Sequence, residues 1–210
     1  MNYIRSRAYD TPELQKKIMG PNPVKLEEEL LSNHRIPKQA VVCDLGSGQG
    51  LTSVFLAKEY GFTVYAADLW SEPEENCRFF REMGLSNEQI IPVKADAMHL
   101  PFEPDFFDAV ISTDSYNYFG RDPKYLDEKL LPFVKSGGYI YLAIPGMKTD
   151  CHDDLPPELL AVMDVGTAGL SARCIVLESH CQPKSRCKTL RDSRDGIQRR
   201  SVGRLAQARK

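Results

Sequence analysis

The stretch VVCDLGSGQGLTSVFLA, residues 41–57, decides how the rest of the sequence is interpreted. Three apolar or small residues lead into Asp44, glycines alternate at positions 46, 48 and 50, and a helix-like segment follows. This order predicts a buried strand, a sharp turn, and a helix whose free N–H groups face a ligand at the end of the strand. An anion or a polar head group fits such a turn, and a tight turn without a ligand is the simpler alternative.

The glycine spacing narrows the choice of ligand. The dinucleotide fingerprint GxGxxG needs a glycine at position 51, where this chain has Leu51, so the spacing is GxGxG. The phosphate-binding loop GxxxxGK[ST] does not occur. Because Leu51 replaces the third glycine of the dinucleotide fingerprint, the glycine spacing argues against a nucleotide-linked oxidoreductase, which we keep only as a weak alternative.

Strand and helix patterns alternate along the first 150 residues. Strands are predicted at 40–44, 62–67, 90–95, 107–111 and 139–144, and helices at 23–31, 51–60, 72–83 and 123–134. Five short apolar strands separated by helices predict an α/β fold, a Rossmann-like doubly wound, mainly parallel sheet with helices on both faces. Ligands of such sheets bind at the carboxyl ends of the strands.

Three acids stand at those carboxyl ends. Asp44, Asp68 and Asp96 close three successive predicted strands. Asp68 follows the glycine turn by 18 residues, where a carboxylate can accept hydrogen bonds from both hydroxyls of a ribose. Each acid alone could be a helix cap or a turn residue, but the three together indicate one ligand-binding edge.

Composition indicates a globular protein of one domain, or one domain and a tail. The 210 residues are 42% hydrophobic and 27% charged. The first ten residues lack the apolar segment of a signal peptide, and no run approaches the roughly 18 apolar residues of a membrane span. We therefore expect a cytoplasmic location, no membrane contact, and mostly free thiols among the six cysteines, none of which are spaced CxxC.

Charge divides the chain near Leu160. Residues 1–160 hold 16 Lys and Arg against 25 Asp and Glu, whereas residues 161–210 hold 11 against 4 and no aromatic residue. We predict an arm and helix at 1–39 on the substrate side, a ligand-binding domain at 40–160, and a poorly ordered basic tail at 161–210. Nucleic acid is an unlikely partner, because the basic run 184–210 has no interleaved aromatic residues for base stacking.

No metal site is expected in the tail. Cys174, His180, Cys181 and Cys187 lie close together, but their spacing matches no familiar zinc site.

Four segments carry a resemblance to a known family: VVCDLGSGQG, VYAADLW, VKADAMHLPFEPDFFDAVIS and LLPFVKSGGYIYLAIPG. They resemble the successive motifs of class I S-adenosylmethionine-dependent methyltransferases, in the small-molecule branch related to the enzymes of quinone biosynthesis. The resemblance covers about residues 30–146, with the motifs in order at appropriate intervals. It implies S-adenosyl-L-methionine as cofactor and methyl transfer to an unidentified small molecule by in-line displacement. A non-catalytic protein that binds S-adenosylmethionine or S-adenosylhomocysteine is the alternative.

The resemblance also implies which residues bind the cofactor. Asp44 and the turn would face its methionine part, Asp68 its ribose hydroxyls, and Leu69 its adenine. Asp96 and the main-chain N–H of Ala97 would meet the adenine edge, and the loop that starts at Ser112 would line the methyl side. The complete set is Asp44, Gly46, Ser47, Gly48, Gly50, Asp68, Leu69, Asp96, Ala97, Ser112 and Thr113.

The same loop bears on the acceptor. Enzymes of this fold that methylate the amino groups of nucleic-acid bases or of glutamine carry Asn/Asp-Pro-Pro-Tyr here. This chain has Ser112-Thr113-Asp114-Ser115-Tyr116, which argues against those acceptors.

No catalytic residue is identified, because an activated methyl group needs alignment more than a base. Asp114, Tyr116 and His99 are weak candidates for proton transfer, and Tyr116 and Tyr118 are better explained as apolar walls around a substrate. A further cluster, Tyr3, Arg5 and Tyr9, could form a substrate lid, although surface residues on a loose N-terminal arm are the simpler interpretation.

The C-terminal part departs from the family pattern. Class I methyltransferases continue after the fifth strand with a helix and two antiparallel strands, but beyond Leu160 only 174–177 has the pattern of a short strand. We therefore expect the C-terminal antiparallel strands to be missing or degenerate. Our hypothesis is that the reading frame departs from the family near Leu160, and resequencing the coding DNA for an aromatic-containing continuation in another frame tests it.

Overall fold

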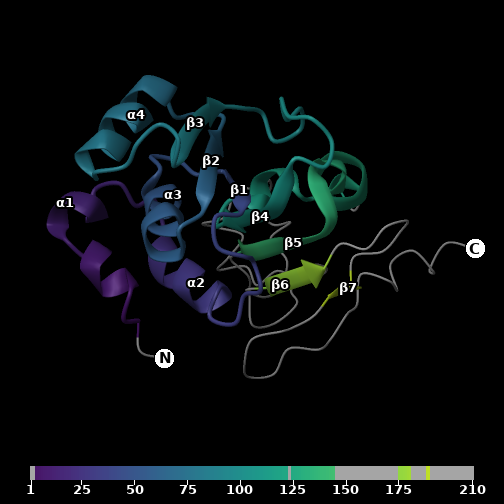
Figure 1. Ribbon diagram of the computed structural model, residues 1–210, viewed down its shortest axis with the longest axis horizontal. Coiled ribbons are helices and arrows are strands. Elements are labelled where there is room, and N and C mark those ends of the chain that lie inside the picture. The colour runs from purple at the N-terminus through teal and green to yellow at the C-terminus, as the bar shows by residue number, and fades with distance from the viewer. Residues whose placement is uncertain (1–2, 123, 145–174, 181–187, 190–210) are drawn as a thin grey trace, which may run out of the picture.

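A computed structural model describes residues 3–122, 124–144, 175–180 and 188–189. Its centre is a seven-stranded sheet with the strand order β3-β2-β1-β4-β5-β6-β7 (Figure 1). The parallel strands are β1 (Val41–Leu45), β2 (Thr63–Asp68), β3 (Ile90–Lys94), β4 (Phe107–Thr113) and β5 (Val134–Ile144). The order reverses between β1 and β4, so the ligand-binding switch point lies at their carboxyl ends. The predicted doubly wound α/β sheet is confirmed.

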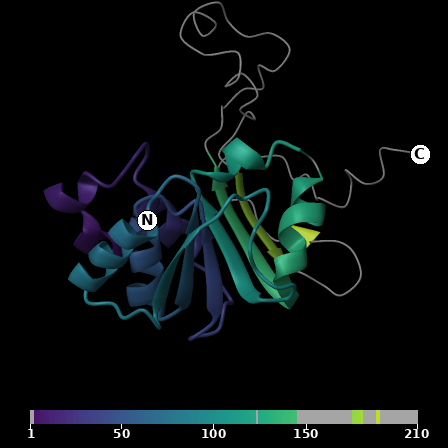
Figure 2. The same ribbon diagram turned by 90° about the horizontal axis from the view of Figure 1, so that it is seen from above.

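Helices cover both faces of the sheet. Figure 2 shows the helices of the N-terminal half on one side and the helical turns of residues 116–133 on the other. The first side is covered by α2 (Pro23–Leu30), α3 (Leu51–Phe55), η2 (Leu56–Tyr60) and α4 (Pro73–Glu82), and the second by α5 (Tyr116–Phe119), η3 (Leu126–Leu130) and η4 (Leu131–Phe133). Because strand side chains alternate, Val42 packs in the first core and Cys43 in the second.

One predicted helix is wrong in part. Instead of a regular helix over 123–134, the described residues form the π-helical turn η3 and the short 3₁₀ turn η4. Pro132 lacks an N–H for an α-helical hydrogen bond, which explains why only the short turn η4 forms around it before β5 begins. Strand β5 starts at Val134 rather than Tyr139, and Gly137 at φ 84° lies where the register with β4 shifts.

The sheet continues beyond the parallel strands. β6 (Ile175–His180) pairs antiparallel with β5 from Tyr139↔His180 to Ile144↔Ile175 and is longer than the predicted strand at 174–177. β7 (Lys188–Thr189) is a two-residue pairing with β6. We predicted that both antiparallel strands of the family are missing or degenerate; the first is present as β6, and the second is reduced to β7. Most of the predicted basic tail lies outside the described residues.

Two kinds of feature are absent from the described ranges. No helix in them is long and apolar enough to cross a membrane. No group of three or more His, Cys, Asp and Glu in them is placed to hold a metal ion. The cysteines Cys174, Cys181 and Cys187 lie outside these ranges.

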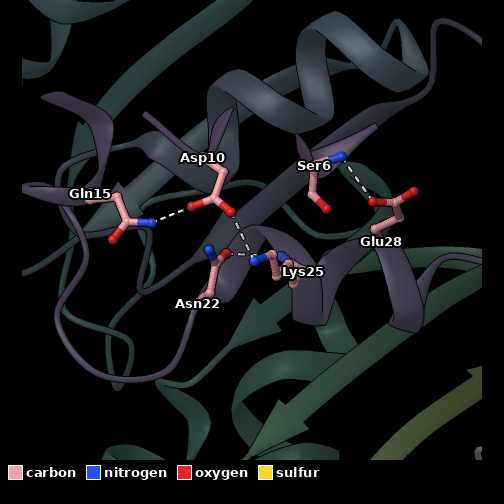
Figure 3. A network of polar contacts seen from close by, with 6 residues as sticks. All are labelled: Ser6, Asp10, Gln15, Asn22, Lys25 and Glu28. Atoms are coloured by element: carbon pink, nitrogen blue, oxygen red, sulfur yellow. Dashed lines mark hydrogen bonds and ion pairs between the residues drawn. The ribbon is translucent and has the colours of Figure 1, made fainter. Parts of the chain in front are cut away.

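The N-terminal arm is tied to α2 by polar contacts. The arm contains η1 (Ser6–Tyr9) and α1 (Pro12–Gln15). Figure 3 shows the Glu28 carboxylate accepting from the N–H of Ser6 at 2.8 Å, and Lys25 Nζ donating to Asp10 Oδ2 at 3.0 Å. Two independent anchors on α2 fix the path of the arm across this helix.

The arm is also part of the core. Tyr9 is 5% exposed, packs edge-on against Phe55 at 5.2 Å between ring centroids, and donates its hydroxyl to Glu59 at 2.9 Å. The Arg5 guanidinium lies 4.6 Å from the centroid of the Tyr60 ring. The interpretation of Tyr9 as a surface or lid residue is therefore wrong, because its ring fills the space between the arm and α3.

Candidate functional site

The backbone conformation of the turn and the packing around it explain its glycines. Gly46, Gly48 and Gly50 all have positive φ, at 80°, 53° and 79°. A Cβ on Gly50 would lie 2.4 Å from the ring of Phe80, and one on Gly46 would lie 2.3 Å from Ser115 Oγ, so packing alone requires glycine there. At Gly48 the nearest atom to such a Cβ would be Met19 Cε at 3.9 Å. Gly48 therefore presents its main chain to the open side of the turn.

Both main-chain groups of Gly48 are fixed by buried side chains. Its N–H donates to Asp68 Oδ2 at 2.9 Å, and its carbonyl accepts from Asn76 Nδ2 at 3.1 Å. The sequence analysis missed Asn76. Its spacing in the sequence could have identified it. The buried side of α4 consists of Asn76, Phe79 and Phe80, and a polar residue on such a side needs a hydrogen-bond partner.

Asp68 organises the loops on both sides of it. Besides the bond from Gly48, its Oδ1 accepts from the N–H groups of Trp70 and Ser71, both at 2.8 Å. A carboxylate has about four acceptor positions, so about one remains for a ligand hydroxyl unless a loop contact is exchanged. Leu69 and Trp70 are 45% and 85% exposed beside it, and Trp70 is a second apolar surface that the sequence analysis did not single out.

Asp44 is buried near the end of β1 and accepts hydrogen bonds from two side chains of α3. Its Oδ2 accepts from Thr52 Oγ1 at 2.7 Å and from Ser53 Oγ at 2.6 Å. Burial raises the pKa of Asp44 to about 6, although the two hydroxyl hydrogen bonds act in the opposite direction. One oxygen of the acid predicted to face the methionine part is thus already engaged inside the protein.

The end of β3 forms a local turn. Asp96 Oδ1 accepts from the N–H of Met98 at 2.8 Å, and Oδ2 lies 3.1 Å from His99 Nδ1. These two contacts lower the pKa of Asp96. The His99 side chain is 78% exposed, and the structure gives it Asp96 as its partner, which favours loop orientation over catalysis. The carbonyl of Ala97 accepts from Tyr125 at 2.8 Å.

The loop after β4 is joined to β1. Ser115 donates to the carbonyl of Leu45 at 2.8 Å, and its Oγ lies 2.7 Å from Ser112 Oγ. Since a hydroxyl has one hydrogen to donate, Ser112 is the donor to Ser115. This chain of bonds holds Ser112 at the switch point between β1 and β4.

Asp114 and Tyr116 have different surroundings. Asp114 has a left-handed backbone with φ 56°, and burial raises the pKa of its half-buried carboxyl. A non-glycine residue in this conformation is uncommon and marks a place where the chain is constrained. Tyr116 packs edge-on against Phe119 at 5.5 Å and Tyr125 at 5.7 Å between centroids, in keeping with an apolar wall.

The segment before α2 covers this edge of the sheet. Met19 Cε approaches Gly48, and a Cβ on Gly20 would lie 2.8 Å from Asp114 Oδ2. Lys17 Nζ lies 4.0 Å from the centroid of the Phe79 ring and holds the segment on α4. Four large, exposed apolar side chains lie along this edge: Met19, Leu69 and Trp70 in loops, and Tyr118 in α5. Clustered exposed apolar side chains are typical of a binding surface.

Two buried polar atoms beside the turn have no hydrogen-bond partner within the described ranges. They are Ser47 Oγ and Glu27 Oε2. Buried polar groups are paired in the great majority of cases, so both atoms have capacity for a ligand. A groove of about 540 Å³ lies between α4 and β3, but none of the predicted cofactor-binding residues lines it. The residues of the carboxyl edge therefore fit a ligand with a polar end at the turn and a flat apolar part near Leu69.

The fold defines the chain as a Rossmann-like α/β domain with a glycine-rich turn at the carboxyl edge of its sheet. Residues 43–142 match a family described as a methyltransferase domain. This match, the N-methyltransferase relatives and the solved methyltransferase structures support the class I S-adenosylmethionine-dependent methyltransferase family and, with it, S-adenosyl-L-methionine as the cofactor.

Individual relatives agree with this family. The sarcosine/dimethylglycine N-methyltransferase of Aphanothece halophytica is 28% identical over 134 residues, which are 63% of this chain and 48% of that protein. The chain spans about half the length of the curated sarcosine/dimethylglycine N-methyltransferases it matches.

Solved structures show the same fold. A Methanococcus maripaludis protein provisionally named an S-adenosyl-L-methionine-dependent methyltransferase superposes with a TM-score of 0.52 and 25% identity, over 70% of this chain and 65% of that one. The phosphoethanolamine N-methyltransferase 2 of Haemonchus contortus superposes with a TM-score of 0.59 over 81% of this chain and 38% of that one. At 18% identity, the second likeness concerns the fold alone.

Proposed function

We propose that this chain transfers a methyl group from S-adenosylmethionine to a small-molecule acceptor by in-line displacement. The observation that carries the proposal is the Gly48 main chain, fixed by Asp68 and Asn76 at the open side of the turn. A main chain held in this way is organised for a ligand before the ligand arrives. The membership of residues 43–142 in a methyltransferase family supports the same function.

The chain would hold the cofactor along the carboxyl edge. The turn from Gly46 to Gly50 would receive the methionine part, Asp68 a ribose hydroxyl, and Leu69 with Trp70 the adenine ring. Asp96 and Ala97 would lie at the adenine edge, and Ser112 and Thr113 on the methyl side. S-adenosylmethionine, when bound, supplies a methyl group already activated by the sulfonium. The protein must still align the acceptor and exclude water. Alignment can lower the activation free energy by up to roughly 7 to 11 kcal/mol.

The acceptor would enter between the arm and the loop after β4. Met19 and Tyr118 would supply apolar walls there, and residues 1–39 would contribute to the substrate side. Asp114 is the acid nearest to Gly20 at this mouth, and a partly buried carboxylate can bind an amine and take up the proton that it loses. The N-methyltransferase names of the relatives also favour an amine acceptor. A cytoplasmic location remains a prediction.

The alternative is a protein that binds the cofactor without transferring its methyl group. Calorimetric titration with S-adenosylmethionine comes first, followed by incubation with methyl-labelled cofactor and a pool of small amines. We expect binding and label transfer. Binding without transfer to any pool would favour the non-catalytic alternative, and absence of binding would contradict both functions.

A further inference from the structure

Glu27 is a buried acid that the proposed function does not use. The sheet-facing side of α2 consists of Val24, Glu27 and Leu30, and the side chain of Glu27 is 0% exposed. A carboxyl group among apolar side chains is costly to bury unless it is well paired. Its place in an otherwise apolar stripe therefore requires an explanation.

Glu27 is poorly paired inside the protein. Its Oε1 accepts from Thr113 Oγ1 at a long 3.4 Å, and its Oε2 has no hydrogen-bond partner within the described ranges. None of the ion pairs among those residues includes Glu27. No cation of the described protein neutralises this carboxyl group.

The surrounding groups favour the protonated form of Glu27. Burial, followed by the charge of Asp44 on β1, raises the pKa of Glu27 well above its usual range, and only the Thr113 hydroxyl acts against them. Burial also raises the pKa values of two phenols on neighbouring elements, Tyr9 of η1 and Tyr60 of η2. The same elements carry Arg7, Lys58 and Glu59, and none of these forms an ion pair with Glu27. Within the described residues Glu27 therefore stands beside a second acid without a positive partner.

The position of this pair points to the ligand. Thr113 is the last residue of β4 and Asp44 the last but one of β1, so Glu27 lies at the switch point, beside the glycine turn. Asp44 Oδ2 already accepts hydrogen bonds from two hydroxyl groups of α3, whereas Glu27 Oε2 accepts none from the part of the chain that the structure describes. A cationic group placed here would pair with the free oxygen and offset the repulsion between the two acids.

We propose that Glu27 is a cofactor-binding residue whose free carboxyl oxygen receives the α-ammonium group of the methionine part. Binding releases the proton of Glu27 to solvent and leaves a carboxylate–ammonium pair in its place. The inference rests on the proposed function, because it assigns Glu27 to the same site.

Calorimetry of the full chain tests this assignment. S-adenosylhomocysteine is titrated at pH 7 in two buffers of different ionisation enthalpy, which measures the number of protons released. The same titration with 5′-methylthioadenosine, which lacks the amino-acid part, isolates the nucleoside contacts. The variants are Glu27→Gln and, as matched control, Glu29→Gln on the outer side of the same helix.

We expect the parent chain and Glu29→Gln to release protons with S-adenosylhomocysteine but not with 5′-methylthioadenosine. Glu27→Gln should bind S-adenosylhomocysteine at least tenfold more weakly and without proton release, and should bind 5′-methylthioadenosine like the parent. Unchanged affinity and proton release in Glu27→Gln, or equal weakening of both ligands, would overturn the role of Glu27 and leave the proposed function intact. Failure of the parent chain to bind either nucleoside ligand would overturn both.

Discussion

Asp68 and Glu27 are both buried acids at the carboxyl edge of one sheet, yet their surroundings are opposite. Asp68 accepts three main-chain N–H groups at 2.8 to 2.9 Å and needs no ligand to be satisfied. Among the described residues, Glu27 has one long hydrogen bond, and its second oxygen has no partner. The β2 side of the site is thus built in advance and adds to stability, whereas the α2 side carries an unsatisfied group that a ligand could complete.

Asp44 lies between these extremes. It is as buried as Glu27, but two hydroxyl groups satisfy one of its oxygens. The number of hydrogen bonds that each acid receives, rather than its burial, separates an acid that supports the fold from one that is available to a ligand.

The largest effect is expected at Gly50, in the glycine turn next to the β2 side of the site. Alanine there would combine a positive φ with a Cβ 2.4 Å from Phe80, and we expect a loss of about 3 kcal/mol or more in the free energy of unfolding. Gly84→Ala is the matched control, because it has φ 77° and nothing within 4 Å of the added Cβ; it should lose only about 1 kcal/mol. Urea unfolding measures both, and equal losses would show that packing against Phe80 does not constrain the turn.

Asp68→Ala should come next. Three N–H groups would lose their acceptor, and we expect a loss of roughly 2 to 3 kcal/mol in unfolding free energy together with a loss of about 1 to 3 kcal/mol in cofactor binding. Asp122→Ala removes an exposed turn acid that accepts one N–H, from Lys124, and should change stability by less than about 0.5 kcal/mol. A fall in cofactor affinity without any loss of stability would contradict the preformed character of this side.

On the unsatisfied side, Glu27→Gln should make the protein more stable at neutral pH. A carboxyl group with a raised pKa in the folded state favours folding below its unfolded value of about 4.5, and this contribution is lost as the pH rises through the folded value. Asp44 acts in the same direction between about pH 4 and pH 6.

The measurement is the melting temperature of both chains from pH 5 to pH 8. At pH 8 the free energy of unfolding of the variant should exceed that of the parent by about 1 to 2 kcal/mol, with a higher melting temperature, and at pH 5 the difference should be small. A parallel pair of curves would mean that Glu27 is already ionised and stabilised in the free protein.

The smallest effect is expected at His99. Its ion pair with Asp96 is exposed, so His99→Ala should change the unfolding free energy by less than about 0.5 kcal/mol. The rate of methyl transfer should stay within twofold of the parent once an acceptor is known. A fall of a hundredfold or more at unchanged stability would instead identify His99 as a general base.

Sequence patterns predicted the frame of this site well. Apolar runs ending in Asp44, Asp68 and Asp96 place three acids at one sheet edge, and the parallel sheet confirms that placement. The predicted helix at 123–134 was wrong in its extent, because Pro132 interrupts the helical hydrogen bonding and the early start of β5 at Val134 depends on its pairing with β4. Tyr9 was misassigned because nothing local in the arm shows that its ring packs on Phe55, 46 residues later in the chain.

The sequence by itself determined the glycine turn, the alternation of strands and helices typical of a doubly wound sheet, and the resemblance to a family that uses them, because these depend on local conformation and on residue spacing. Only the tertiary structure decided which acid is satisfied and which is not. Glu27 and Thr113 are 86 residues apart in the chain, and their meeting depends on how α2 packs across the end of β4. Hydrogen bonds between distant segments follow from packing, and no periodicity in the chain records them.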